Sequence, residues 1–165
     1  MPRYSGAEAA TAPADDVLRV VHLRSGVVLS ARGGALGKQL PLFRLGLGGR
    51  LGRGGQFISW ISLDDELSAI ETVLADDRLT GPVNAVSPNP VTNSAFTAAL
   101  AAALHRPARL AVPRIALAAV LGPELANELL LSGQRVLPAR LTDVGHLFSH
   151  PNLADALASI LSDRT

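Results

Sequence analysis

The segment from Gly52 to Asp65 constrains the fold more than any other part of the chain. It reads Gly-Arg-Gly-Gly-Gln-Phe-Ile-Ser-Trp-Ile-Ser-Leu-Asp-Asp: a glycine-rich turn, an apolar run of strand length and an acidic helix start. Short apolar runs favour strands, and carboxylates favour the positive amino end of a helix. The segment therefore predicts a turn, strand and helix in succession, and 165 residues are enough for one α/β domain with a buried core.

Strand and helix signals continue on both sides of this unit. The pattern predicts strands over 18–23, 27–30, 57–63, 83–86 and 109–112, and helices from Asp64, from Thr92 or Asn93, and over 114–121, 123–131 and 152–161. Leu67, Ile70 and Leu74 share one face of the helix that starts at Asp64. Residues 32–55 contain nine glycines, so unusual backbone freedom is expected there.

Composition limits the class of partner and the compartment. The formal net charge of +1 gives no electrostatic reason to expect nucleic acid or an anionic membrane as partner, which leaves small molecules and proteins. The absence of cysteine excludes disulfides and thiolate chemistry and fits a reducing cytoplasm. The most apolar region, 110–131, is interrupted by proline and charged residues and predicts no membrane span. Fourteen arginines against one lysine suit anion binding or reflect a coding bias.

Five stretches in order resemble one branch of the extended short-chain dehydrogenases, the epimerase-like family related to cell-division inhibition. They are VVHLRSGVVL (20–29), the segment 33–65, GPVNAVSPNPVTNSAF (81–96), 105–113 and GQRVLPARL (133–141). The resemblance implies the carboxyl-terminal part of a Rossmann-like α/β fold with a small α+β substrate lobe. It divides the chain into a leader or weak helix (1–16), late Rossmann strands with substrate-lobe elements (17–106), and the family's small carboxyl-terminal domain (107–165).

The same resemblance implies an NAD or NADP site whose nicotinamide lies beside Arg24, Ser25 and Gly26. The acid–base pair of that superfamily, Tyr-x-x-x-Lys, has no counterpart, because the only tyrosine is Tyr4 and Glu8 stands four residues later. No glycine-rich dinucleotide loop follows a strand: the nearest run, 46–51, lacks its last glycine. We therefore name no catalytic residue, and cofactor binding by this chain alone is doubtful.

Substrate-binding candidates come from the glycine-rich loop, the strand after it and two later turns. They are Arg50, Arg53, Gln56, Trp60, Asn89, Asn93 and Arg135. Guanidinium groups in a glycine loop suit phosphate or carboxylate, although such a loop is equally a plain surface connection. Each of the others has a structural alternative: core packing for Trp60, which we favour, local turn and cap bonds for the asparagines, and helix capping for Arg135.

Two further groups of polar residues are expected to be structural. Ser62 is placed to cap the following helix through a Ser-x-x-Asp arrangement with Asp65, and Asp64 and Asp65 suit the helix dipole better than paired catalysis. His146 and His150 have a spacing that binds zinc on a helix, but Leu147, Phe148 and Ser149 between them indicate strand or loop, so no metal is expected.

Two functional hypotheses remain open at this stage. In the first, the chain is the substrate-side fragment of an NAD(P)-dependent epimerase or oxidoreductase, inactive without its other half. In the second, it is a non-enzymatic binding or protein-interaction module that keeps the fold of that lobe. A lobe without its other half exposes strand edges and apolar surface, so either association with that half or self-association is expected.

Overall fold

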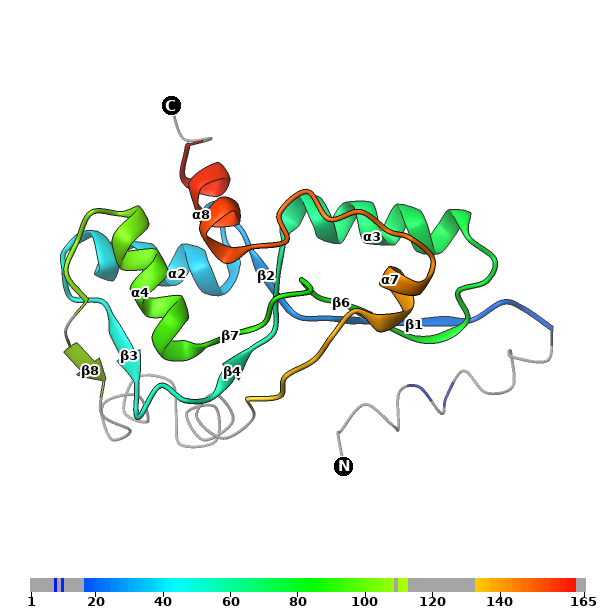
Figure 1. Cartoon of the computed structure of the whole chain (residues 1–165), viewed down its shortest axis with the longest axis horizontal. Coiled ribbons are helices and arrows are strands. Elements are labelled where there is room, and N and C mark those ends of the chain that lie inside the picture. The colour runs from blue at the N-terminus through cyan, green and yellow to red at the C-terminus, as the bar shows by residue number, and fades with distance from the viewer. Residues whose placement is uncertain (1–7, 9, 11–16, 109, 113–132, 163–165) are drawn as a thin grey trace.

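The computed structural model describes residues 8, 10, 17–108, 110–112 and 133–162. The strands are β1 (Val21–Ser25), β2 (Val27–Leu29), β3 (Gly49–Leu51), β4 (Phe57–Ile58), β5 (Trp60–Ser62), β6 (Gly81–Ala85), β7 (Val91–Thr92) and β8 (Leu110–Val112). The helices are α2 (Gly34–Arg44), α3 (Leu63–Ala75), α4 (Asn93–Ala103), α7 (Ala139–Asp143) and α8 (Leu153–Ser162). Figure 1 shows them spread along the long axis of the molecule.

The strands form four pairs rather than one wide sheet. Three pairs are parallel (β1 with β6, β2 with β5, β3 with β8), and β4 with β7 is antiparallel. Parallel pairs require crossover connections, and each of these contains a helix: α2 lies in the chain between β2 and β5, α3 between β1 and β6, and α4 between β3 and β8. The α/β class predicted from the sequence is therefore confirmed.

The interval of nine glycines contains a helix that sequence reasoning missed. α2 spans Gly34–Arg44 and buries Leu36, Leu40 and Phe43 on one face. Their spacing of four and three residues is a helical signal, but the surrounding glycines and Pro41 lower helix propensity and obscured it. Burial of that face offsets the weak local propensity, as tertiary packing often does.

The starts of α3 and α4, in contrast, follow the sequence signals. The Ser62 hydroxyl accepts a hydrogen bond from the Asp65 amide at 3.1 Å and donates one to the Asp65 carboxylate at 2.9 Å, so the predicted Ser-x-x-Asp cap of α3 is confirmed. Thr92, one of the two predicted caps, accepts from the Ala95 amide at 3.2 Å and begins α4. Both caps use a side chain to satisfy an amide that the helix leaves free.

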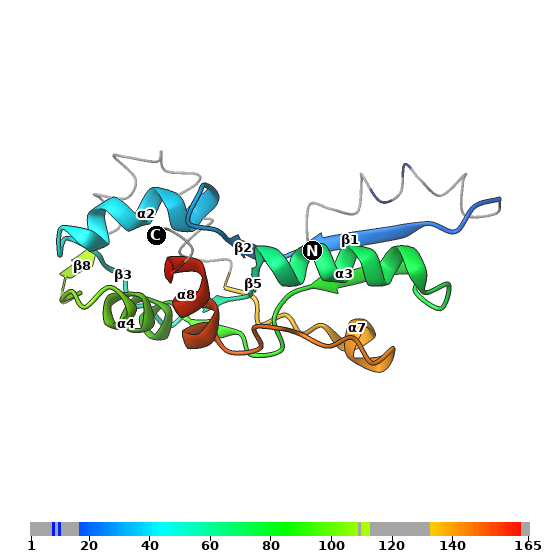
Figure 2. The same cartoon turned by 90° about the horizontal axis from the view of Figure 1, so that it is seen from above.

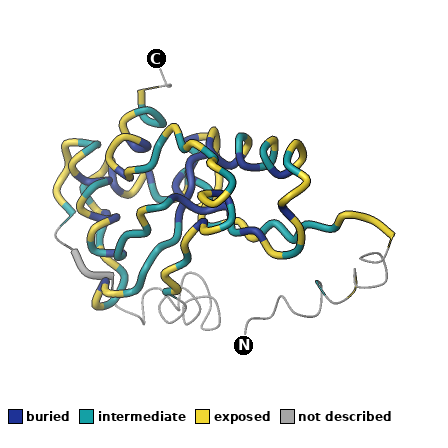
Figure 3. The backbone as a smooth tube through the Cα atoms, turned by 45° about the vertical axis from the view of Figure 1, so that its right-hand side comes forward, coloured by how far each residue is buried: buried dark blue, intermediate teal, exposed yellow. Residues whose placement is uncertain are grey.

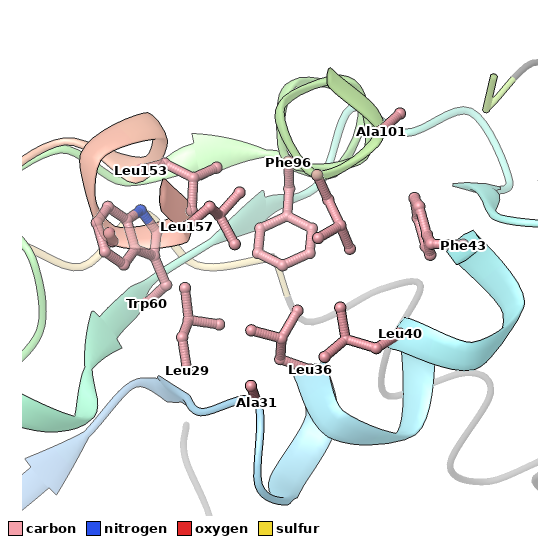
Figure 4. Packing of buried hydrophobic residues seen from close by; sticks show 12 residues of the cluster. Leu29, Ala31, Leu36, Leu40, Phe43, Trp60, Phe96, Ala101, Leu153 and Leu157 are labelled. Carbon is pink, nitrogen blue, oxygen red and sulfur yellow. The ribbon is translucent and has the colours of Figure 1, made fainter. Parts of the chain in front are cut away.

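Two hydrophobic cores lie side by side and share β5 as a wall. Trp60 points into the first core, which α2, α4 and α8 surround (Figure 4), and Ile61 points into the second, between α3, β6 and α7. Both side chains are fully buried because successive residues of a strand face opposite sides. Figure 3 shows the buried residues concentrated in the middle of the molecule, where β2 and β5 run.

The remaining predictions divide into those that fall on described residues and those that do not. The predicted strands over 18–23, 27–30 and 83–86 correspond to β1, β2 and β6, and the predicted last helix corresponds to α8. The predicted strand over 57–63 is interrupted at Ser59 and continues as β5. The predicted helices over 114–121 and 123–131, and all of the leader except Glu8 and Ala10, lie outside the described residues. No helix in the described ranges is long and apolar enough to cross a bilayer.

Candidate functional site

Gly26 marks the point where the chain leaves one strand pair and joins another. Its amide donates to the carbonyl of Ala85, beyond which β6 ends, at 2.9 Å, and the next amide, of Val27, donates to the carbonyl of Ser59 at 2.8 Å. The break between the strands predicted over 18–23 and 27–30 is thus reduced to this one residue, because β1 continues through Ser25. Ligands of open parallel sheets bind at the carboxyl ends of strands, which is where Ser25 and Gly26 lie.

We predict that Gly26→Ala destabilises the fold by about 1–3 kcal/mol, as overpacking typically does. A Cβ at this position would lie 2.6 Å from the Ser59 carbonyl oxygen and 2.9 Å from the Val86 side chain, and the first of these is backbone that cannot rotate away. Urea unfolding of the variant measures the loss. Gly33→Ala is the matched control, since a Cβ at Gly33 meets nothing within 4 Å; equal losses at both positions would contradict this account.

A buried carboxylate lies behind the exposed end of β1. The Ser25 hydroxyl donates to Glu66 Oε1 at 2.5 Å, and Glu66, in the first turn of α3, is 7% exposed. Its other oxygen, Oε2, is buried and has no hydrogen-bond partner among the described residues. Sequence reasoning grouped Glu66 with the acidic helix start and missed this contact, because a link across 41 residues leaves no local signal.

The neighbouring Arg24 is exposed and already paired. Its guanidinium donates to both carboxylate oxygens of Glu8, at 2.8 and 2.7 Å, in a bidentate arrangement. Hydrogen bonding from Arg24 lowers the pKa of Glu8 below its usual value. The pair joins β1 to a residue of the predicted leader, so Arg24 reaches a cofactor only by exchanging this partner.

Asp65 holds the segment before α8 against the start of α3. It is fully buried, and its carboxylate accepts hydrogen bonds from the backbone amides of Ser149 at 2.7 Å and His150 at 3.0 Å. The imidazole Nδ1 of His150 lies 3.2 Å from the Ser62 hydroxyl, which belongs to the same network. Buried Ser62 and Asp65, with half-buried His150, thus serve a structural purpose, because a carboxylate taken out of water needs such donors.

The substrate candidates fall into two groups rather than one site. In the first, Gln56 donates its side-chain amide to the Leu51 carbonyl at 3.2 Å, and the Asn93 side chain accepts from the Leu51 amide at 2.7 Å. In the second, the Trp60 indole donates to the Asn89 carbonyl at 3.1 Å, and the Asn89 side chain donates to the carbonyl of Pro151 at 3.1 Å. These four side chains hydrogen-bond backbone groups of neighbouring segments and so support the local fold, and their substrate-binding role stays a prediction.

The charged candidates are accessible from solvent. Arg50 and Arg53 are exposed in and just after β3, and the Arg135 guanidinium lies over the Phe57 ring, 5.9 Å from its centroid. The segment of Arg135 also runs beside the break between β4 and β5, where the Ser59 hydroxyl donates to the Gln134 carbonyl at 2.8 Å. Through Ser59 this segment is adjacent to Gly26, so Arg135 is the charged substrate candidate connected most directly to the end of β1.

Two cavities on the described surface are lined by residues other than those predicted for cofactor or substrate. One of about 370 Å³ lies where β1 and β6 begin, beside Arg19 and Gly81. The other, of about 280 Å³, lies between Pro88 and the residues from Leu137 to Asp143.

The histidine pair predicted not to bind metal occupies two separate environments. Among the described residues no group of three or more His, Asp or Glu side chains is placed to hold a metal ion. His146 Nδ1 lies 2.8 Å from the Thr72 hydroxyl, and because that hydroxyl donates to the Ser68 carbonyl, we assign the ring proton to Nδ1. The other ring nitrogen, Nε2, is buried and meets no hydrogen-bond partner in the described part of the chain; the Phe148 ring lies edge-on beside the imidazole.

We expect stability to fall as the pH drops below about 6.5, and His146 to cause part of that fall. Burial lowers the pKa of His146 below its ordinary value of 6.5, and the nearby Asp65 opposes this shift. The unfolded chain therefore takes up the proton first, so the contribution is complete above 6.5 and is lost as the pH falls through the folded-state pKa. Urea midpoints at pH 7.5 and 5.5 measure it. His146→Gln should reduce the pH dependence, whereas changing exposed His105 to Gln should not; equal pH dependence in all three proteins would contradict the assignment.

The parallel strand pairs, the crossover helices and a polar turn at a strand end define a Rossmann-like α/β fold, and comparison with known proteins agrees. A crystal structure of human epimerase family protein SDR39U1 (isoform 2) with NADPH superposes with a TM-score of 0.83 at 41% identity, covering 88% of this chain and 49% of that one. A nucleoside-diphosphate sugar epimerase from Corynebacterium glutamicum gives 0.70 at 36% identity, with 93% of this chain and 29% of that chain covered.

The homologues are epimerase family proteins. Epimerase family protein Mb2239 of Mycobacterium bovis is 48% identical over 151 residues, which are 91% of this chain and 50% of that protein. Human SDR39U1 is 42% identical over 154 residues, 93% of this chain and 52% of that protein. A family described as "Domain of unknown function (DUF1731)" matches residues 112–160. The chain thus spans about half the length of the curated relatives that it matches.

Proposed function

We propose that the chain forms the substrate-side, carboxyl-terminal half of an NAD(P)-dependent epimerase or oxidoreductase, and that catalysis needs a nucleotide-binding half from outside these 165 residues. One combined observation carries this proposal: the chain is strongly similar to epimerase family proteins, but the same stretch of sequence lacks groups that such enzymes need for catalysis and for cofactor binding. Similarity covers 91% of the chain at 48% identity, yet the sequence offers neither the acid–base Tyr-x-x-x-Lys pair nor a dinucleotide glycine loop.

The geometry at the end of β1 supports the same proposal. The end of a parallel strand is where this class of sheet binds its ligand, and Ser25 and Gly26 present a hydroxyl and a close-packed backbone there. Arg135 lies on the adjacent segment and supplies a cation for an acidic substrate group. The NADPH in the human SDR39U1 structure makes a nicotinamide dinucleotide the cofactor to test.

The alternative, a non-enzymatic binding module, is favoured by one observation. The amide groups of Gln56, Asn89 and Asn93 all bond to the chain's own backbone, so they serve the fold whether or not a ligand binds. A module that had lost its catalytic and cofactor-binding residues would still need these hydrogen bonds for its fold.

A titration of NADPH followed by its fluorescence separates the two functions. The chain alone should show no saturable binding below millimolar concentration, because its sequence has no glycine-rich loop to bind the pyrophosphate of NADPH. The chain purified together with the unmatched half of Mb2239 should bind NADPH stoichiometrically in the micromolar range. Tight binding and turnover by the chain alone would overturn the need for a second half, and a stable complex that ignores NADPH would favour the binding module.

A further inference from the structure

Two buried carboxylates stand next to each other in the first turn of α3, and the fold accounts for only one of them. Asp65 is fully buried, and its carboxylate accepts three hydrogen bonds, one from a side-chain hydroxyl and two from backbone amides. Glu66 is 7% exposed, and within the described residues its carboxylate accepts one hydrogen bond, from the Ser25 hydroxyl. Because a buried charge needs several donors, Glu66 lacks the compensation that its neighbour has.

The surroundings of Glu66 are apolar rather than cationic. Its Oε2 atom is buried without a hydrogen-bond partner in the described part of the chain, and no ion pair between described residues includes Glu66. Glu66, Ala69 and Val73 follow one another at helical spacing and are buried on α3. On β1, Leu23 packs against the same core two residues before Ser25. The carboxylate therefore ends an apolar contact, where charges interact strongly.

This carboxylate lies next to the strand end at which ligands of parallel sheets bind. Figure 2 shows β1 and α3 side by side, with the first turn of α3 beside the end of β1, where Ser25 donates to Glu66. Ser25 itself is exposed, so its hydroxyl stands between the buried carboxylate and the surface. The amino end of α3 stabilises a negative charge on Glu66. A cation bound beside Ser25 would therefore lie close to an uncompensated negative charge.

We propose that Glu66 selectively stabilises the oxidised form of the cofactor, NADP⁺, relative to NADPH. The two forms differ in charge at one place, because the oxidised nicotinamide ring is positively charged and the reduced ring is neutral. The inference rests on the proposed function, in which the nicotinamide lies at the end of β1 beside Ser25. The Oε2 atom that lacks a partner within the described ranges fits such a ring, since a nearby cation stabilises a buried carboxylate.

The test compares both cofactor forms in the full chain purified with the unmatched half of Mb2239. Glu66→Gln keeps the size of the side chain and an acceptor for the Ser25 hydroxyl but removes the charge. We expect the Kd of NADP⁺, measured by calorimetric titration, to rise about tenfold, and the Kd of NADPH, measured by its fluorescence, to change less than about twofold. Asp64→Asn is the matched control and should leave both constants unchanged, because it removes the same charge from the same helix turn at an exposed, solvent-screened position.

A second variant tests the premise without the cofactor. Glu66→Met in the chain alone replaces the carboxylate with an apolar side chain of similar size, and exposed Ser25 then bonds to water. The urea midpoint should rise, because an incompletely compensated buried charge is removed. A lower midpoint would show that the carboxylate serves the fold and would overturn the inference. In the complex Glu66→Met should lose the same NADP⁺ selectivity, so the test does not depend on the folding of one substitution.

The outcomes separate the inference from the function. Cofactor binding with an unchanged ratio of the two Kd values in both Glu66 variants, or an equal weakening of both forms, would overturn the inference and keep the proposed function. A loss confined to NADP⁺ would support both. If the wild-type complex bound neither form, the proposed function would fail, and the inference would fail with it.

Discussion

Replacing Asp65 with alanine should lower the free energy of unfolding by at least about 3 kcal/mol. The substitution removes the acceptor of the partly buried amides of Ser149 and His150 and of the buried Ser62 hydroxyl, and an unsatisfied buried donor costs about 1–3 kcal/mol. Asp65→Asn should lose less, because its one remaining carbonyl oxygen still accepts. Urea unfolding with a fixed slope measures both variants.

Asp64 provides the control for this prediction. It carries the same charge in the same helix turn but is exposed, so Asp64→Ala should cost only about 0.3–1 kcal/mol through the helix dipole. A large difference between the neighbours would show that burial and hydrogen bonding, not charge at the helix start, give Asp65 its effect. Equal losses at the two positions would refute the role of the network.

Trp60→Ala should destabilise the chain by about 3–5 kcal/mol, the usual range for removing a large buried aromatic side chain. Trp60 is fully buried and packs beside Leu29, Leu153 and Leu157 in the first core (Figure 4). The cavity would lie between β5 and α8 and could close only by moving that helix. Trp60→Phe should cost less, since it keeps part of the volume and frees only the exposed Asn89 carbonyl.

Thermal or urea unfolding of both Trp60 variants, beside Leu147→Ala as an exposed control, checks this expectation. The control should change stability by less than about 0.5 kcal/mol. A Trp60→Ala variant that remained as stable as wild type would show that the indole is not a core group, and would reopen its predicted role as a substrate contact.

Local signals in the sequence predicted local structure well. The caps at Ser62 and Thr92 were predictable because a cap depends on residues only three apart. α2 was missed because its glycines and its proline lower the local helix propensity. The burial of Leu36 and Leu40, which stabilises the helix, depends on contacts with β2 and α4, and these contacts have no local signal. In α3, the pattern of Leu67, Ile70 and Leu74 indicated one apolar face but gave no sign that the core uses Ala69 and Val73 instead.

The candidate site was predictable only in part for the same reason. The end of β1 at Ser25 and Gly26 followed from the resemblance, but the contact of Ser25 with Glu66 joins residues 41 positions apart and has no sequence signature. Asparagine and glutamine serve turns and ligands equally well, so Asn89, Asn93 and Gln56 could not be assigned to one purpose without the contacts that the structure provides.

The shared wall of β5 has a consequence for how the molecule comes apart. Trp60 belongs to the first core and Ile61 to the second. Neither core can therefore lose β5 without exposing apolar surface in the other. The two cores should therefore unfold as a single cooperative unit. Hydrogen exchange measures this: the slowest-exchanging amides of α3 and α4 should report the same opening free energy. Hinge motion between the two cores is disfavoured. The end of β1 and the segment of Arg135 should therefore keep a fixed position relative to each other.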